Sequence, residues 1–184
     1  MLNQGPATLT NCTFSDNLTT LNPAFGGAAI GNDTYDGVGF TLNVINCTIA
    51  NNTAGPGQGG GIWNVAGCTL NLTNTIVAQN TAGSGPDVFG SINTADHNLI
   101  GDGGGSTIAT DLGGNLIGGN GNPVIDPRLG PLQNNGGPTQ TLALFADSPA
   151  IGHANNALAP ATDQRGNKRV EKHGEVTDIG AYEY

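Results

Sequence analysis

Three aspartates in a glycine-rich segment are the residues whose type and spacing could bind a metal ion. Asp102, Asp111 and Asp126 lie between short glycine clusters, and carboxylates combined with backbone carbonyls of such turns are ligands that calcium prefers. Their spacing matches neither an EF-hand loop nor the short calcium-binding repeat of other solenoids. Turn-forming Asp and Asn residues explain the same pattern, so the sequence leaves two expectations open, bound calcium and no cofactor.

Acid–base cleavage of polysaccharides is the second chemistry to consider. It needs paired carboxylates in a cleft, or carboxylates that hold calcium beside a basic residue. The first 80 residues offer only Asp16, Asp33 and Asp36 as acids, and the first half of the chain contains no Lys or Arg. His153 and His173 have no partner at a regular spacing and are expected at the surface. We therefore expect a protein that is not an enzyme.

The three cysteines are the remaining residues whose side chains could react. Cys12, Cys47 and Cys68 are too few for a disulfide scaffold and match no zinc spacing. Cys12 and Cys47 occupy equivalent positions of the repeat described below. Free thiols are favoured there, because in-register neighbours hold their Cβ atoms further apart than a relaxed disulfide prefers, and a disulfide is the alternative. A nucleophilic cysteine would need a nearby base, and no histidine precedes His97.

Charge and hydropathy exclude two classes of partner. The net charge is −9, with 14 acidic and 5 basic residues, and such a surface repels nucleic-acid phosphates. Four of the five cations lie within residues 165–172 and are expected to form a solvated turn. No apolar run is long enough to span a membrane. The first residues lack both parts of a secretion signal, so either a signal was removed with upstream sequence or Met1 is not the native start.

An internal repeat indicates the elements that position these residues. Segments 9–17, 44–52 and 72–80 superpose without gaps, at offsets of 35 and 28 residues. A glycine pair before an isoleucine recurs at 26–30 and 60–62. Constant columns at variable spacing predict the coils of one solenoid that carry loops of different length. A β-sandwich would also give short strands, but it would not repeat asparagine columns.

Stacked coils would align equivalent residues into ladders. Two apolar ladders are expected to face inward: Leu9, Val44 and Leu72, and Phe14, Ile49 and Val77. Two asparagine ladders are expected at successive corners: Asn11, Asn46 and Asn74, and Asn17, Asn52 and Asn80. Side-chain amides can bond to each other along the axis, and Asn tolerates the left-handed conformation of a sharp corner. Thr13 and Thr48 would point outward.

N-glycosylation sequons also follow from this repeat. They begin at Asn11, Asn17, Asn32, Asn46, Asn51 and Asn71. Asparagines of an inward ladder could not carry a glycan after folding. Exposed ones such as Asn32 could carry one if the source glycosylates.

The last third of the sequence is expected to form a cap. Six prolines between residues 123 and 160 interrupt strand pairing in succession, and the open end of a β-helix must be covered. Asp163 and Arg165, with Asp178, are expected to form a paired corner that holds a last strand at 178–184.

From about Asp87 onward the sequence resembles the choice-of-anchor Q domain of bacterial surface proteins. The shared motifs are NLIGD at 98–102, DPRLGPL at 126–132, NNGGPT at 134–139, SPAI at 148–151, DQRG at 163–166 and DIGAYE at 178–183. They follow the order of that family over nearly 100 residues. The N-terminal coils are similar, more loosely, to those of polymorphic outer-membrane proteins. This resemblance implies a β-helical passenger of a large exported protein.

These observations combine into one expected organisation. The fold is an all-β, right-handed parallel β-helix with a proline-rich C-terminal capping region. Coils occupy residues 1–125, and the C-terminal coil and cap occupy residues 126–184 of the same continuous domain. The expected function is that of a non-catalytic structural or adhesive element, extracellular or at the cell surface, which self-associates head to tail into a filament. The alternative is a carbohydrate-binding or polysaccharide-active β-helix domain.

Overall fold

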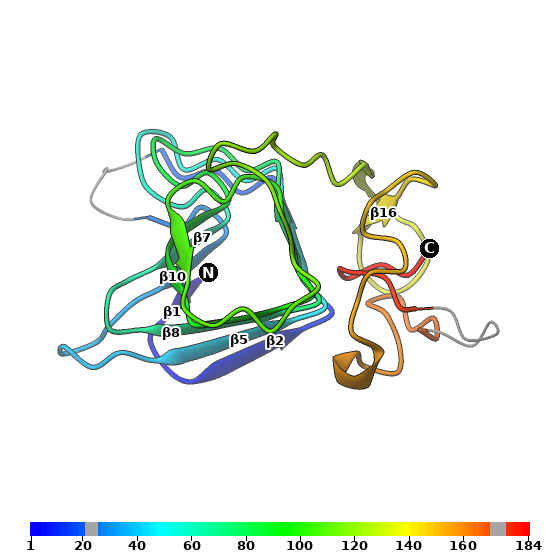
Figure 1. Ribbon diagram of the computed structural model, residues 1–184, viewed down its shortest axis with the longest axis horizontal. Coiled ribbons are helices and arrows are strands. Elements are labelled where there is room, and N and C mark those ends of the chain that lie inside the picture. The colour runs from blue at the N-terminus through cyan, green and yellow to red at the C-terminus, as the bar shows by residue number, and fades with distance from the viewer. Residues whose placement is uncertain (21–25, 170–175) are drawn as a thin grey trace.

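The chain forms a right-handed parallel β-helix with a C-terminal region beside it. The computed structural model describes residues 1–20, 26–169 and 176–184. Figure 1 is a view along the axis on which the coils stack, so that they appear as a closed ring. The C-terminal region lies next to one wall of that ring. The expected fold class is therefore confirmed.

Three parallel sheets form the walls of the ring. The first four coils contribute a strand to each wall, and the fifth contributes strands to the first and third walls. The first sheet contains β1 (Leu2–Asn3), β4 (Ile30–Asn32), β7 (Ile62–Asn64), β10 (Val88–Ile92) and β13 (Ser106–Ile108). The second contains β2 (Ala7–Thr10), β5 (Thr41–Ile45), β8 (Thr69–Thr73) and β11 (Thr94–Asp96). The third contains β3 (Thr13–Ser15), β6 (Thr48–Ala50), β9 (Ile76–Ala78), β12 (Leu99–Ile100) and β14 (Leu116–Ile117).

The strand register matches the repeat found in the sequence. Leu9 pairs with Val44, and Val44 pairs with Leu72. In the third sheet, the strands that carry Phe14 and Ile49 pair in the same way. Side chains alternate between the two faces of a strand, and β5 and β8 accordingly alternate between partly and fully buried residues. The apolar ladders thus form the continuous core inside the coils.

The C-terminal region has a small core of its own. It contains an antiparallel hairpin of β15 (Leu129–Gln133) and β16 (Thr141–Leu144), followed by a 3-10 helix η1 (Asn156–Leu158). Leu144 and Ile179 pack against Ile76 and Leu99, which point outward from β9 and β12. The third sheet is therefore buried on both faces along β6, β9 and β12.

This arrangement differs from the expected one in two respects. The region covers the flank of the coils along the third sheet, whereas the sequence suggested that it covers an open end. The reason is that outward positions of the third sheet, such as Ile76, are apolar and fully buried and need a covering layer. No strand is present at residues 178–184, where the backbone forms bends held by side-chain contacts. Within the described residues, no helix is long and apolar enough to cross a membrane.

Candidate functional site

The inward ladder of Asn17, Asn52 and Asn80 is a continuous chain of amide hydrogen bonds. Asn17 Nδ2 donates to Asn52 Oδ1 at 2.7 Å, and Asn52 Nδ2 donates to Asn80 Oδ1 at 2.8 Å. Asn52 and Asn80 are buried. The left-handed residues of this corner lie one position earlier than expected, at Asp16, Asn51 and Gln79, with φ of 59–63°. The ladder residues can therefore point inward while their neighbours make the bend.

A buried carboxylate accepts the last amide of this ladder. Asp87 Oδ1 accepts hydrogen bonds from the side chain and the backbone N–H of Asn80 at 2.9 and 3.0 Å. Its Oδ2 accepts from the backbone N–H of Asp102 at 2.6 Å. Burial raises the pKa of Asp87 to about 6, although these N–H donors act in the opposite direction. Sequence analysis missed this residue, because it lies outside the repeat columns.

The other predicted ladder, Asn11, Asn46 and Asn74, lies at the corner between the second and third sheets. All three residues adopt the left-handed conformation, with φ of 45–51°. One amide pair bonds along the axis, since Asn74 Nδ2 donates to Asn46 Oδ1 at 3.2 Å. The remaining contacts join the coils to the C-terminal region. This column is therefore a junction as well as a ladder.

Each asparagine of this corner column contacts a different backbone segment of the C-terminal region. Asn11 Nδ2 donates to the Thr162 carbonyl at 2.7 Å. Asn46 Nδ2 lies 3.5 Å from the carbonyl oxygens of both Asp178 and Gly180. The corresponding contacts of the third coil are tighter: Asn74 exchanges two hydrogen bonds with the backbone of Asn155, at 2.7 and 3.0 Å. The C-terminal region thus spans at least three successive coils.

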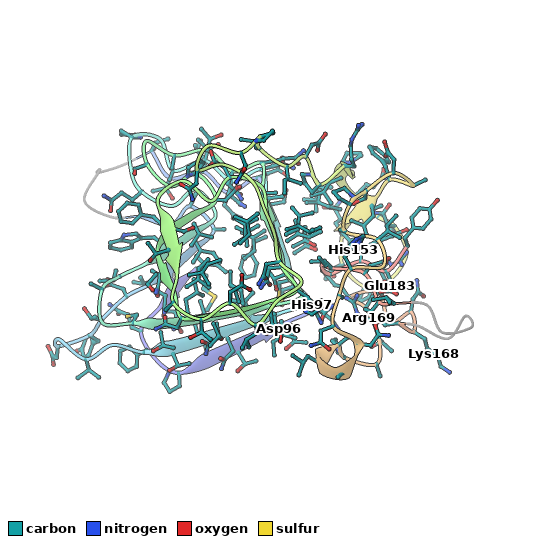
Figure 2. The ribbon with its side chains drawn as sticks, viewed as in Figure 1. Asp96, His97, His153, Lys168, Arg169 and Glu183 are labelled. Carbon is teal, nitrogen blue, oxygen red and sulfur yellow. The ribbon has the colours of Figure 1, made fainter. Side chains whose placement is uncertain are left out.

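Arg169 is the central side chain of this junction. Its side chain is 1% exposed. The guanidinium donates to Glu183 Oε2 at 2.9 Å, to the Gly180 carbonyl at 2.7 Å and to Asn11 Oδ1 at 3.1 Å. Figure 2 shows Arg169 next to Glu183, in the C-terminal region beside the ring of coils. Burial lowers its pKa, and the charge of Glu183 opposes that shift. The expectation of a solvated basic turn is therefore wrong at this residue.

The predicted corner residues Asp163, Arg165 and Asp178 lie in the same junction. Arg165 pairs with Asp163 at 2.8 Å and lies over the Tyr182 ring, 3.6 Å from its centre. Asp178 is placed differently, since its carboxylate accepts the backbone N–H groups of Gly152 and Tyr184. These contacts hold the last residues of the chain without a strand.

One further column of polar side chains escaped the sequence analysis. In the first sheet, Asn3 Nδ2 donates to Asn32 Oδ1 at 2.8 Å, and Asn32 Nδ2 donates to Asn64 Oδ1 at 2.7 Å. Asn32 is completely buried, so the expectation that it is exposed enough to carry a glycan is wrong. Asn51 is an exposed sequon residue instead. In β1, β4 and β7 only the last residue is polar, which gave no recognisable repeat.

The predicted column of Cys12 and Cys47 continues along the stack. The Cys12 backbone N–H donates to Cys47 Sγ at 3.4 Å, and the Cys47 N–H donates to Thr75 Oγ1 at 3.3 Å. The column continues through Asn98 Oδ1, which accepts the Thr75 N–H at 2.9 Å. All three cysteines of the chain are free thiols.

The three calcium candidates lie in separate turns. Asp102 accepts the Gly104 N–H at 2.8 Å. Asp111 accepts the Asn115 side chain at 2.6 Å, and Asp126 accepts the Gln79 side chain at 3.1 Å. The described residues contain no group of three or more His, Cys, Asp or Glu residues that could hold a metal ion.

A carboxylate–imidazole pair lies where the fourth coil meets the C-terminal region (Figure 2). Asp96 Oδ1 lies 2.6 Å from His97 Nδ1 and accepts a hydrogen bond from the Asn155 side chain at 3.3 Å. His97 is left-handed, with φ of 51°, and occupies the position of the corner asparagines in its coil. His153, by contrast, is exposed and contacts the Ile151 carbonyl at 2.7 Å.

An uncharged surface lies on the opposite side of the coils. Trp63 of β7 and Phe89 of β10 are direct neighbours in the first sheet, and both are partly exposed. Beside Phe89 lies an open cavity of about 520 Å³. Its lining includes Asn93, Ser91 and Cys68, with no charged side chain.

Comparison with known proteins adds no assignment, because no family model, no curated protein and no solved structure matches this chain.

Proposed function

We propose that this chain is a non-catalytic structural segment of an extracellular or cell-surface β-helical protein. The observation that carries the proposal is the use of polar side chains. Asparagines of the repeat columns bond to neighbouring coils or to the C-terminal region. Such contacts stabilise the stack and leave these amides engaged within the protein.

The C-terminal region supports this role because it ties successive coils together. Its contacts begin at Asn11 in the first coil and end at Asp96 in the fourth. Separation of any two of these coils along the axis would have to break contacts of this region as well as strand pairing. A surface element exposed to mechanical stress and proteases would benefit from such a brace.

The resemblance to the choice-of-anchor Q domain is part of the same proposal. Two of the motifs that carry it, DQRG at 163–166 and DIGAYE at 178–183, supply much of the junction with the coils. Asp163 and Arg165 come from the first motif, and Gly180 and Glu183 come from the second. A structural role of these motifs accounts for their residue types without a catalytic function.

Two measurements test the proposal. An antibody against the folded protein should label intact source cells or their secreted material, and protease treatment of intact cells should remove cell-bound label. The purified protein should release no products from pectin, alginate or chondroitin, with or without calcium. Label found only after cell lysis, or reproducible product release, would contradict the proposal.

Head-to-tail self-association is a further part of the proposed function. Strands β1, β2 and β3 each pair with one later strand of the described chain, and the C-terminal region lies at the flank. Their other edges present backbone donors and acceptors, which a second copy could complete. This contact does not close on itself, so it would produce a filament. Size-exclusion chromatography and electron micrographs test this, and a monodisperse monomer at micromolar concentration contradicts it.

Binding of neutral glycans is the second candidate function. It is favoured by Trp63 and Phe89, which lie side by side on an uncharged surface next to an open cavity. Aromatic rings offer flat apolar area, and neighbouring polar groups can orient a ligand. A glycan array should show binding that Trp63→Ala abolishes and that Tyr35→Ala, at an exposed tyrosine elsewhere on the surface, preserves. Equal signals from both variants would exclude this surface.

A further inference from the structure

Cys12 and Cys47 form a stacked pair of thiols between the first and second coils. Each occupies the position just before a strand of the third sheet, and the two strands pair in register. Each thiol donates to the carbonyl two residues earlier, at 3.2 Å for Cys12 and 3.3 Å for Cys47. The two side chains therefore point in the same direction, one above the other.

The spacing of the coils suits a covalent link. Neighbouring strands lie about 4.8 Å apart, which is within the range of about 4.4–6.8 Å between the Cα atoms of a disulfide. The Cβ atoms of parallel side chains are further apart than a disulfide prefers, so one side chain must turn toward the other. Cys12 can do so, because it lies in the first coil, is partly exposed and gives up only a weak thiol–carbonyl contact.

The environments of the two sulfurs differ in the way that disulfide formation requires. Cys47 is completely buried, whereas Cys12 is partly exposed. The hydrogen bond with the Cys47 side chain lowers the pKa of Cys12 to about 6, and the same contact raises the pKa of Cys47. Cys12 is thus the accessible thiolate, and Cys47 is the neighbouring thiol.

We propose that Cys12 and Cys47 form a reversible disulfide that links the first coil to the second when the protein meets a small organic disulfide. Cys12 Sγ attacks one sulfur of that oxidant, forms a mixed disulfide and releases the other half as a thiolate. Cys47 loses its proton to solvent, and its sulfur attacks Cys12 Sγ and displaces the second half as another thiolate. Two protein thiols are oxidised and one organic disulfide is reduced to two thiols.

The link would stabilise the coil that has a neighbour on only one side. Among the described residues, β3 pairs only with β6 in the third sheet, so its opening requires the loss of one ladder of hydrogen bonds. A disulfide between Cys12 and Cys47 would hold this coil in place even when those bonds open. Oxidation is therefore expected to raise the melting temperature and to slow proteolysis near Asn17.

The decisive experiment uses Cys68→Ser, which leaves the two stacked cysteines as the only thiols. The folded variant is incubated with oxidised glutathione, quenched with acid, alkylated in denaturant and digested with a protease that cleaves before aspartate. That protease places Cys12 in fragment 1–15 and Cys47 in fragment 36–86. The matched controls are Cys12→Ser and Cys47→Ser in the same background. The melting temperature of each reduced variant checks that it folds.

We expect the two fragments to be linked in a monomer, the alkylatable thiols to fall from two to none, and dithiothreitol to restore both. The Cys47→Ser control should retain a glutathione adduct on Cys12, and the Cys12→Ser control should form neither adduct nor link. Three results would overturn the proposal: two thiols that stay alkylatable, a Cys12 adduct that persists beside Cys47, or linked fragments found only in dimers. If Cys68→Ser fails to fold, Cys68→Ala replaces it.

Discussion

Replacement of Asn52 by alanine measures directly what an inward asparagine ladder contributes. The Asn52 side chain takes part in five hydrogen bonds. It accepts from the side chain and the backbone N–H of Asn17, and it donates to Asn80 Oδ1 and to the carbonyls of Phe14 and Ala50. Alanine removes all five and leaves buried partners without a bond in a site where Asn52 itself is 0% exposed.

The expected loss follows from the number of bonds and their burial. A net contribution of about 0.5–1.5 kcal/mol per hydrogen bond, reduced for bonds that share a donor, gives a loss of about 3–5 kcal/mol in the free energy of unfolding. The control is Asn51→Gly at the adjacent residue, which is exposed and left-handed with φ of 63°. Glycine adopts this conformation without strain, so the control should change stability by less than about 0.5 kcal/mol.

Urea unfolding followed by Trp63 fluorescence and far-ultraviolet circular dichroism provides the assay. Asn52→Ala should lower the midpoint strongly with an unchanged slope, which reports the exposed surface. A loss below about 1 kcal/mol, or a loss equal to that of Asn51→Gly, would refute the reasoning that the ladder stabilises the stack.

Three further predictions concern the corner, the buried acid and the brace. Asn46→Ala should cost about 1–3 kcal/mol, and Asn46→Gly should cost less because glycine relieves the left-handed strain; equal melting temperatures for wild type and Asn46→Ala would contradict this. The pKa of Asp87 is raised to about 6 from the ordinary 3.8, so the folded state binds the proton more tightly. Protonated Asp87 therefore adds to the free energy of unfolding below about pH 4. This contribution is lost as the pH rises through 6, by up to about 3 kcal/mol relative to Asp87→Asn. If urea titrations show that the stability difference between wild type and Asp87→Asn stays flat or grows with pH, the N–H donors outweigh burial. Deletion of 178–184 removes Ile179 from the outer face of the third sheet and should cause aggregation or loss of cooperative unfolding, so a soluble truncation with the wild-type melting temperature would be the contrary result.

The coils could be predicted from the sequence because their columns combine two signals. Val44 and Leu72 alternate with polar residues, and an asparagine follows each strand at a constant position. The ladder of Asn3, Asn32 and Asn64 could not be recognised as a repeat, because the residues on either side of each asparagine differ from coil to coil.

The position of the C-terminal region could not be predicted for a different reason. Its contacts with the corner asparagines join residues more than 80 positions apart and use backbone carbonyls, such as those of Thr162 and Gly180. Backbone carbonyls carry no residue type, so they leave no pattern in a sequence. Arg169 was misjudged for the related reason that a charged residue is usually solvated, and only the packed structure supplies its buried acceptors.

The amide chain that ends at Asp87 has a direction, and this has a consequence for how such a protein can grow. Every amide from Asn17 to Asn80 donates toward the C-terminal side of the stack, and Asp87 ends the series as an acceptor without a donor of its own. A duplicated coil inserted between Asn52 and Asn80 would bring one donor and one acceptor and would leave the series balanced. The coil that follows Asp87 supplies a backbone donor instead, since the Asp102 N–H donates to Asp87 Oδ2. An asparagine of a coil duplicated after Asp87 would receive no hydrogen bond from this carboxylate. The hydrogen-bond pattern therefore allows duplicated coils to be added on the N-terminal side of Asp87. The acid itself fixes the C-terminal end of the amide ladder.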